Sequence, residues 1–236
     1  MPHFYAHRVF GELVWNQLPQ HIRDKLTPQK SGFRLGLYGP DPLFFYQSWK
    51  RSPVYREGLA QHRQGPQAVL ERYRGHTAEP QALGYTMGWL CHYMLDAACH
   101  PIIRSACAGK SVGHAAIELA LDRRLIKKHP LPKEDAFPPE VFFAAALGCK
   151  HTSADQFRQA LKGFYRFSYS TAALYRGGGD AALCAKLMVQ LHQAVPECVR
   201  LAAKLVDCLE HGKALDWLPQ TDFNGLRCNP TESVVK

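Results

Sequence analysis

Several signatures that would assign a chain to a familiar class are missing from this sequence. No run of about 18 or more apolar residues occurs, so no helix is expected to span a membrane. The eight cysteines never form a CxxC pair, which argues against zinc-ribbon and thioredoxin-like motifs and favours buried free thiols. The first residues have neither the basic start nor the apolar core of a secretory signal, and we therefore expect a cytoplasmic location.

Sustained alternation of apolar and polar residues, which marks a half-buried strand, is also lacking. Apolar residues instead recur at helical spacing along most of the 236 residues, and no internal repeat divides them. A chain of this length most economically forms one domain. We therefore predict an all-α fold, a single compact multi-helix domain over residues 1–236.

The helical spacing also predicts where the elements lie. Helices are expected over residues 5–17, 20–26, 66–73, 80–101, 112–127, 140–149, 153–175 and 180–211, followed by a tail over 213–236. Residues 32–49 are rich in glycine, proline and aromatic side chains, and we expect an ordered, irregular loop there. Gly84 and Gly88 weaken a predicted helix, which points to close approach of another backbone. Ser153 and Gln156 have the spacing of a capping box.

Basic residues outnumber acidic ones. The 29 Lys and Arg residues against 20 Asp and Glu give a formal charge of +9, which favours anionic partners such as phosphates, nucleic acid or a membrane surface. The densest basic run, residues 123–129, closes a predicted helix, where cations interact favourably with the helix dipole. We interpret this run as a solvated helix end rather than as a ligand-binding patch.

Five potential metal ligands lie close together in the sequence. His92, Asp96 and His100 follow one another at intervals of four, which places their side chains on one face of a helix. His114 and Glu118 repeat this spacing on the next predicted helix. One such pair alone would indicate a structural hydrogen bond. Burying several imidazoles and carboxylates without a cation costs several kcal/mol each, so five together favour a metal site.

The chemistry of these side chains narrows the choice of metal. Imidazoles and carboxylates without thiolates suit zinc, and also iron or manganese. The ligands exceed the needs of one tetrahedral ion, whereas two ions about 3.5–4 Å apart, bridged by Asp96, would use them and could act on a phosphoryl group. The sequence has no ExxH pair, no HExxH motif and no His-Asp doublet, which excludes three other kinds of helical metal site.

Further motifs extend this pattern towards the amino terminus. In chain order the six motifs are Tyr5-Ala-His7, Gly39-Pro-Asp41, Gly58-Leu-Ala-Gln-His62, Cys91-His92-Tyr-Met-Leu-Asp96, Cys99-His100-Pro101 and Gly113-His114-Ala-Ala-Ile-Glu118. Together they resemble the zinc-dependent phospholipase C family, which is itself similar to the S1/P1-type nucleases. The ligands of these motifs lie within residues 7–118, and the helical remainder over 126–212 carries no matching motif.

The resemblance implies a phospholipase C/P1 nuclease-type fold with two to three zinc ions. It implies a first zinc held by Asp41, His62, His92 and Asp96, a second held by His100, His114 and Glu118, and a third held by His7 together with Asp96. In secreted members the N-terminal residue completes the third site, a role that would fall here to Met1 or Pro2. The resemblance also implies that zinc-bound water or hydroxide attacks phosphorus, with Asp41 as the general base.

Three functions follow from this interpretation. The leading one is hydrolysis of a phospholipid or a related phosphodiester. A single-strand nuclease or nucleotidase with the same metals is the second, and a non-catalytic, metal-stabilised binding protein is the third. The aromatic stretch Phe44–Trp49 could contact lipid or a choline-like head group by cation–π attraction, or could simply belong to the core.

Overall fold

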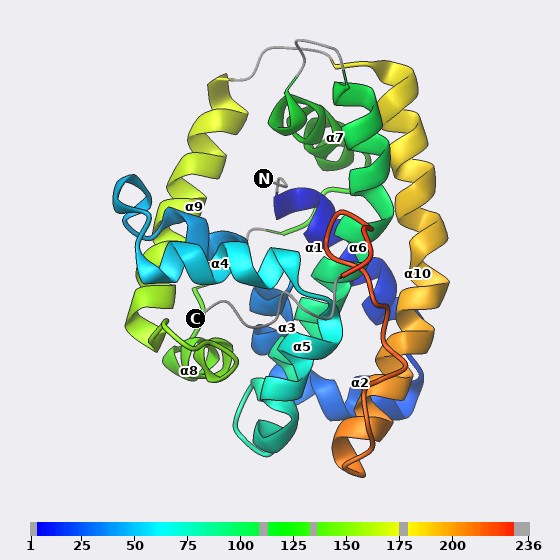
Figure 1. Cartoon of the computed structure of the whole chain (residues 1–236). Coiled ribbons are helices and arrows are strands. Elements are labelled where there is room, and N and C mark those ends of the chain that lie inside the picture. Colours follow the sequence, from blue (N-terminus) through cyan, green and yellow to red (C-terminus); the bar gives the residue numbers. More distant parts are fainter. Residues whose placement is uncertain (1–3, 109–112, 133–135, 175–178, 229–236) are drawn as a thin grey trace.

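The computed structural model describes residues 4–108, 113–132, 136–174 and 179–228 (Figure 1). The α-helices are α1 (Phe4–Gln17), α2 (Gln20–Leu26), α3 (Lys30–Gly36), α4 (Pro53–Arg63), α5 (Pro66–Leu70), α6 (Ala82–Cys107), α7 (His114–Lys128), α8 (Pro139–Leu147), α9 (Ala154–Leu174) and α10 (Ala181–Glu210). Short 3-10 helices are η1 (Thr27–Gln29), η2 (Asp41–Phe45), η3 (Ser48–Lys50) and η4 (Glu71–His76).

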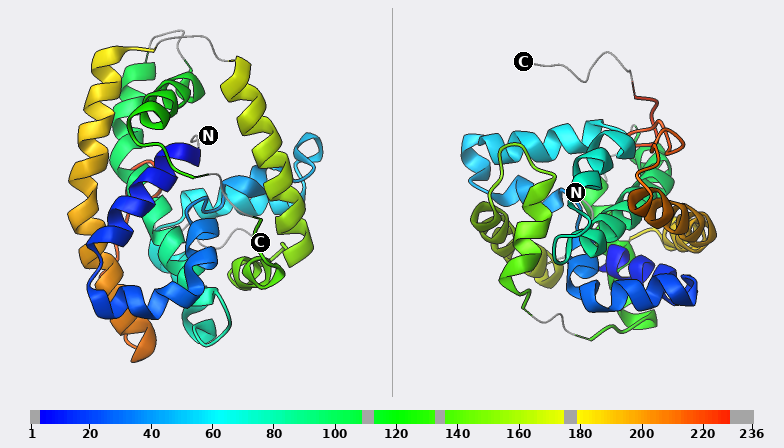
Figure 2. Two further views of the ribbon diagram at one scale, coloured as in Figure 1. Left: turned by 180° about the vertical axis from the view of Figure 1, so that it is seen from behind. Right: turned by 90° about the horizontal axis from the view of Figure 1, so that it is seen from below.

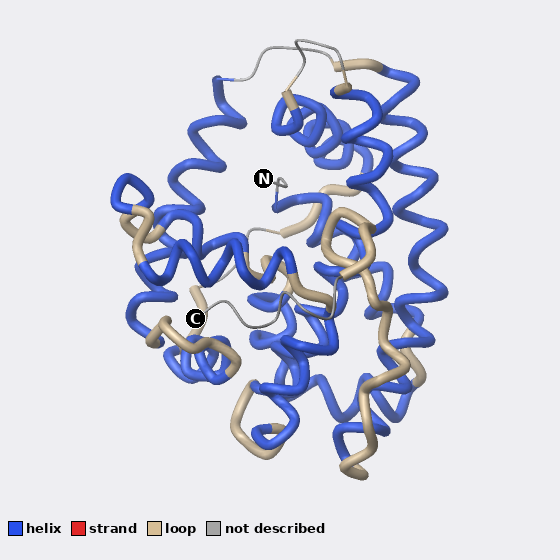
Figure 3. The backbone as a smooth tube through the Cα atoms, viewed as in Figure 1, coloured by secondary structure: helices blue, strands red, loops and turns tan. Residues whose placement is uncertain are grey.

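The predicted all-α class is confirmed. Figure 3 shows helices and loops but no strand in the described ranges, where the β-type contact is a single bridge between Thr221 and Arg227. Among the same residues, no helix combines the length and the apolar character needed to cross a bilayer. The capping box is also confirmed, because Ser153 N–H donates to Gln156 Oε1 at 2.9 Å and Gln156 N–H donates to Ser153 Oγ at 3.3 Å.

Helix α6 is the element around which the others pack. Most of its side chains are buried, and it contacts α1, α3, α8 and α10 (Figures 1 and 2). Up to His100 no residue of this helix is exposed, so apolar side chains occur on most of its faces. Pro101, where the sequence pattern predicted an end or a kink, lies inside α6, and the helix continues to Cys107. Because proline has no N–H, Pro101 cannot donate to the carbonyl oxygen of Ala97 one turn earlier. Gly225 of the tail lies close to this oxygen, and a Cβ added to Gly225 would lie 3.3 Å from it.

Helices α3 and α6 cross at very short range because four glycines lie at the contact: Gly32, Gly36, Gly84 and Gly88. A Cβ added to Gly36 would lie 2.2 Å from the carbonyl oxygen of Tyr85, and one added to Gly88 would lie 2.0 Å from that of Phe33. The close approach predicted at Gly84 and Gly88 is therefore confirmed. The irregular loop predicted over 32–49 is wrong in part, because residues 30–36 form α3 and η2 and η3 follow. Gly32 and Gly36 serve this helix contact rather than a turn.

The chain after α10 returns across the front of α6 (Figure 1). In this tail Leu215, Leu218 and Phe223 are buried, with Phe223 fully inaccessible. Tyr93 of α6 holds the tail through its hydroxyl, which lies 3.0 Å from the Thr221 carbonyl oxygen and 2.7 Å from Thr221 Oγ1. The tail is thus part of the packed structure up to Phe223.

Candidate metal centre

Helix α6 places its row of ligands in the interior of the molecule. His92, Asp96 and His100 are 0%, 2% and 6% exposed, and helical spacing aligns the three side chains on one face. Ligands from α1, η2, α4 and α7 face this row. The centre is therefore assembled from five elements, α6 and the four that surround it.

The first side of the centre is formed by η2 and α4. Asp41 Oδ1 lies 2.9 Å from His62 Nε2 and 3.9 Å from His92 Nε2. Gly39, which has φ of +50°, brings the chain so close that an added Cβ would lie 2.3 Å from the ring of His92. This left-handed turn is readily adopted only by glycine, and it sets Asp41 against α6.

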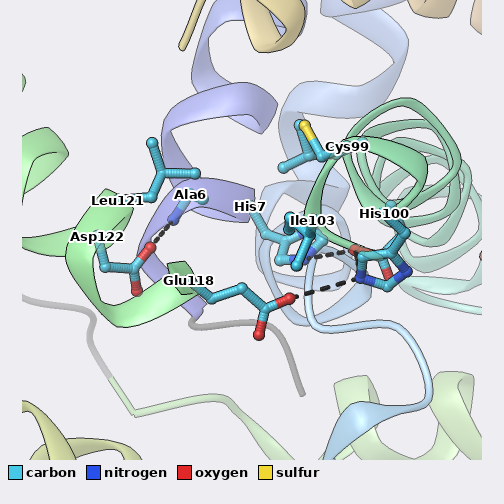
Figure 4. Close-up of a pocket in the computed structure, with 10 residues that line it drawn as sticks. Ala6, His7, Cys99, His100, Ile103, Glu118, Leu121 and Asp122 are labelled. Atoms are coloured by element: carbon cyan, nitrogen blue, oxygen red, sulfur yellow. Dashed lines mark hydrogen bonds and ion pairs between the residues drawn. The ribbon is translucent and has the colours of Figure 1, made fainter. Parts of the chain in front are cut away.

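The opposite side is formed by α7. Glu118 Oε1 lies 2.6 Å from His114 Nε2 and 3.5 Å from His100 Nε2. Asp96 Oδ1 lies 3.4 Å from the same His100 nitrogen, so the two sides of the centre are linked through α6. Figure 4 shows Glu118 and His100 facing each other at this end.

His7 of α1 enters between the two sides. Its Nε2 lies 3.3 Å from Asp96 Oδ1, and its ring stacks on that of His92 with the centroids 4.2 Å apart. Asp96 Oδ2 lies 3.5 Å from His92 Nε2. One carboxylate thus faces the imidazoles of three histidines, as a bridging ligand would.

All eight predicted ligands occur in three groups whose donor atoms lie within 4.8 Å of one another. The groups are His7–Asp41–His92, His62–His92–Asp96 and His100–His114–Glu118. The third reproduces the set implied by the resemblance for one zinc. The other two share His92 and divide the remaining ligands differently, with His7 beside Asp41 as well as Asp96. The predicted contributions of Met1 and Pro2 lie outside the described residues.

Backbone carbonyls orient the imidazoles. The Nδ1 atom of His62 lies 2.8 Å from the carbonyl oxygen of Gly58, and that of His92 lies 3.1 Å from the carbonyl oxygen of Leu37. The Nδ1 atom of His100 lies 2.8 Å from the carbonyl oxygen of Phe223. A carbonyl can only accept, so Nδ1 carries the hydrogen and Nε2 presents its lone pair to the centre. This arrangement is typical of histidines that bind a metal through Nε2.

Several buried polar atoms of the centre have no hydrogen-bond partner among the residues that the structure describes. They are His7 Nδ1, His92 Nε2, Asp96 Oδ2 and His100 Nε2. Leaving such atoms unsatisfied in a protein interior costs roughly 1–3 kcal/mol each. A cation would satisfy them, and imidazole nitrogens with carboxylate oxygens are ligands that zinc accepts. The residues therefore fit the predicted metal.

The electrostatics of the metal-free centre are strongly perturbed. Burial, together with His7, lowers the pKa of His92 to about 4. Burial alone would also lower the pKa of His100, but Asp96 and Glu118 raise it to about 9. Burial would raise the pKa of Asp96, but the surrounding histidines hold it well below its usual range. Because the pKa of His100 is raised, a cation that binds its Nε2 must displace a proton there.

A small cavity of about 20 Å³ lies between α1, α6 and α7 (Figure 4). Its polar lining comes from His7, Asp96, His100, Glu118 and Asp122, and its remaining walls are apolar. A space of this size holds about one water molecule or one ion. The cavity thus places an ion-sized opening beside the third ligand group.

Asp122 was not predicted from the sequence as a site residue. Its carboxylate accepts the backbone N–H groups of Tyr5 at 3.1 Å and Ala6 at 2.9 Å, which fixes the first turn of α1 directly before His7 (Figure 4). Burial raises the pKa of this carboxyl well above its usual range, although the two N–H groups oppose the shift. Asp122 continues the row of His114 and Glu118 by another four residues, and that spacing could have indicated it.

Phe223 was also missed, and no sequence signal indicates it. Its carbonyl accepts from His100 Nδ1, while its ring lies 4.6 Å from the ring of His62 and 5.5 Å from that of His92. The tail therefore contacts ligands on both sides of the centre.

Comparison with known proteins agrees with this geometry. The model of the zinc-dependent phospholipase C family matches residues 6–173, which include every predicted ligand. Neither the curated proteins nor the solved structures gave a match. The matched range covers well over half of the sequence, and it implies a zinc-dependent, phospholipase-like hydrolase. The chain belongs to the zinc-dependent phospholipase C family.

Proposed function

We propose that the protein hydrolyses a phosphodiester, that its substrate is a phospholipid, and that it uses two to three zinc ions held by the eight predicted ligands. The observation that supports this proposal is the set of three ligand groups linked through His92 and Asp96, in a chain of the zinc-dependent phospholipase C family. When bound, zinc would polarise a phosphoryl oxygen and lower the pKa of a water molecule.

The residues of the chain have separate parts in this function. The Nδ1–H bonds of His62, His92 and His100 hold three rings with Nε2 towards the centre, so little reorganisation is needed when ligands engage. Asp41 is the general base in our proposal. Its carboxylate is 1% exposed and lies beside His62, where it would accept a proton from the attacking water.

Assays of the purified, zinc-supplemented protein on phosphatidylcholine vesicles and on single-stranded DNA test the proposal. We expect release of diacylglycerol, abolished by EDTA and by the Asp96→Asn variant. Cleavage of DNA alone would replace the lipid by the nuclease alternative. If EDTA lowers the melting temperature but neither substrate is ever cleaved, the chain is a metal-stabilised binding protein.

A further inference from the structure

The loop around η3 exposes a tryptophan on a projecting part of the molecule. Trp49 is 78% exposed, and the loop projects from the body beside α9 (Figures 1 and 2). An indole of this size is usually at least partly covered in a soluble protein, because its apolar area is large. Trp49 thus leaves a large apolar side chain accessible to a partner.

The backbone holds this tryptophan in place. Gln47 and Arg51, directly before and after η3, both have φ of 44°, a left-handed conformation that residues other than glycine rarely adopt. Backbone N–H groups of Lys50 and Arg51 donate to the carbonyls of Gln47 at 2.9 Å and Ser48 at 3.3 Å. Such conformations persist where the surrounding structure requires them, and they concentrate at functional positions.

The segment that carries Trp49 and the neighbouring segment of α9 contain basic residues but no acidic ones. Residues 42–56 and 156–174 contain six Lys and Arg residues and no Asp or Glu. All six are exposed: Lys50, Arg51, Arg56, Arg158, Lys162 and Arg166. Arg158 pairs with Asp155 at 2.8 Å, just before the second segment. The surface thus combines an aromatic tip with an excess of positive charge.

The two segments form one continuous surface because α9 packs against η2. Gly163 permits the contact, since an added Cβ would lie 3.0 Å from the carbonyl oxygen of Phe45. The ring of Phe45 lies 5.1 Å from that of Phe167, which is itself 42% exposed. Phe45 and Phe167 therefore form an apolar contact between η2 and α9.

The same stretch of chain reaches the candidate metal centre. Residues 41–51 begin at the ligand Asp41 and end beside Trp49. Between them, the ring of Phe44 lies 4.9 Å from the ring of His62. A partner bound at the loop would thus contact the same short stretch of chain that carries Asp41 and the Phe44 ring beside His62.

We propose that this surface, Trp49 with Lys50 and Arg51 and the adjoining basic face of α9, docks the protein on an anionic phospholipid bilayer. Positive charge is complementary to anionic lipid, and tryptophan is favoured at the boundary between head groups and acyl chains. The choice of a lipid partner rests on the proposed function. The docking surface adds to that function a lipid-facing region beside the centre.

Vesicle sedimentation tests the surface independently of turnover. We expect the protein to bind vesicles of mixed phosphatidylglycerol and phosphatidylcholine, and to bind pure phosphatidylcholine much more weakly. The double variant Lys50→Gln/Arg51→Gln should reduce the partition coefficient about 30-fold, from the usual contribution of basic residues near an anionic surface. Trp49→Ala should reduce it about tenfold, and the tryptophan fluorescence shift on binding should be lost with it.

The matched control is Lys127→Gln/Lys128→Gln, which removes the same charge from exposed positions at the end of α7. We expect at most about a twofold reduction in this control, because screening limits the attraction of distant charges. Equal losses in both double variants would overturn a localised surface. Absence of vesicle binding would also overturn it. So would binding of single-stranded DNA in place of vesicles, if the variants at Trp49 and at Lys50 and Arg51 abolish that binding. Binding without diacylglycerol release would support the surface and reject the proposed function.

Discussion

Replacing Phe223 by alanine tests whether the tail orients the metal ligands or merely fills space. The Phe223 ring is fully buried, and truncation of such a phenylalanine costs about 3–5 kcal/mol of stability. Its carbonyl accepts from His100 Nδ1 at 2.8 Å and would lose the anchor that positions it. Loss of an orienting partner of a ligand typically weakens metal binding about 10–100-fold. We expect both losses in Phe223→Ala.

Urea unfolding of the metal-free protein measures the first loss, and zinc titration against a competing chelator measures the second. The control is Phe157→Ala on α9, since Phe157 is also fully buried and its ring neighbour is Tyr85 at 6.2 Å. We expect a similar loss of stability in this control but unchanged zinc affinity. Equal zinc affinities in the two variants would refute an orienting role for the tail.

Three further predictions concern the centre and the helix crossing. Asp96→Asn should lower the zinc content from two or three ions to one or none, because Asp96 faces three histidines. Mass spectrometry measures this content, and fewer than one ion in the wild type would contradict the metal assignment. In the metal-free protein the pKa of His100 is raised to about 9, above its value of about 6.5 in the unfolded chain. The contribution of His100 to stability should therefore be fully present at pH 6.5 and be lost as the pH rises to about 9. Urea unfolding across this range should show the fall, and zinc should abolish it because it binds the neutral ring. Gly88→Ala should destabilise the fold by several kcal/mol, since the added Cβ would lie 2.0 Å from the Phe33 carbonyl oxygen. Gly75→Ala is the control and should leave stability unchanged, because a Cβ there would have no atom within 4 Å. Equal melting temperatures of the two variants would contradict the close crossing.

The sequence was most informative where spacing determines geometry. Intervals of four placed His92, Asp96 and His100 on one helical face, and the structure brings them together as expected. Glycines were less informative, because the same residue type serves turns and close helix contacts. Gly36 therefore suggested a loop although it lies in α3 against the backbone of α6.

Contacts between distant parts of the chain could not be predicted in the same way. No local pattern relates Phe223 to His100, because their contact depends on how the tail crosses α6. Asp122 is an intermediate case, since its spacing from Glu118 is visible but its partners, the N–H groups of Tyr5 and Ala6, are not. The predicted ligands were accessible to motif recognition, whereas the groups that contact them became visible only in the fold.

The crossing of the tail over α6 has a consequence for the order of synthesis. The ligands extend from His7 to Glu118, so every one of them has left the ribosome well before Phe223 is translated. Until then His100 lacks the carbonyl that fixes its tautomer, and His62 and His92 lack the aromatic ring that covers them. The candidate metal centre therefore reaches its final geometry only after the tail has been synthesised and has packed across α6.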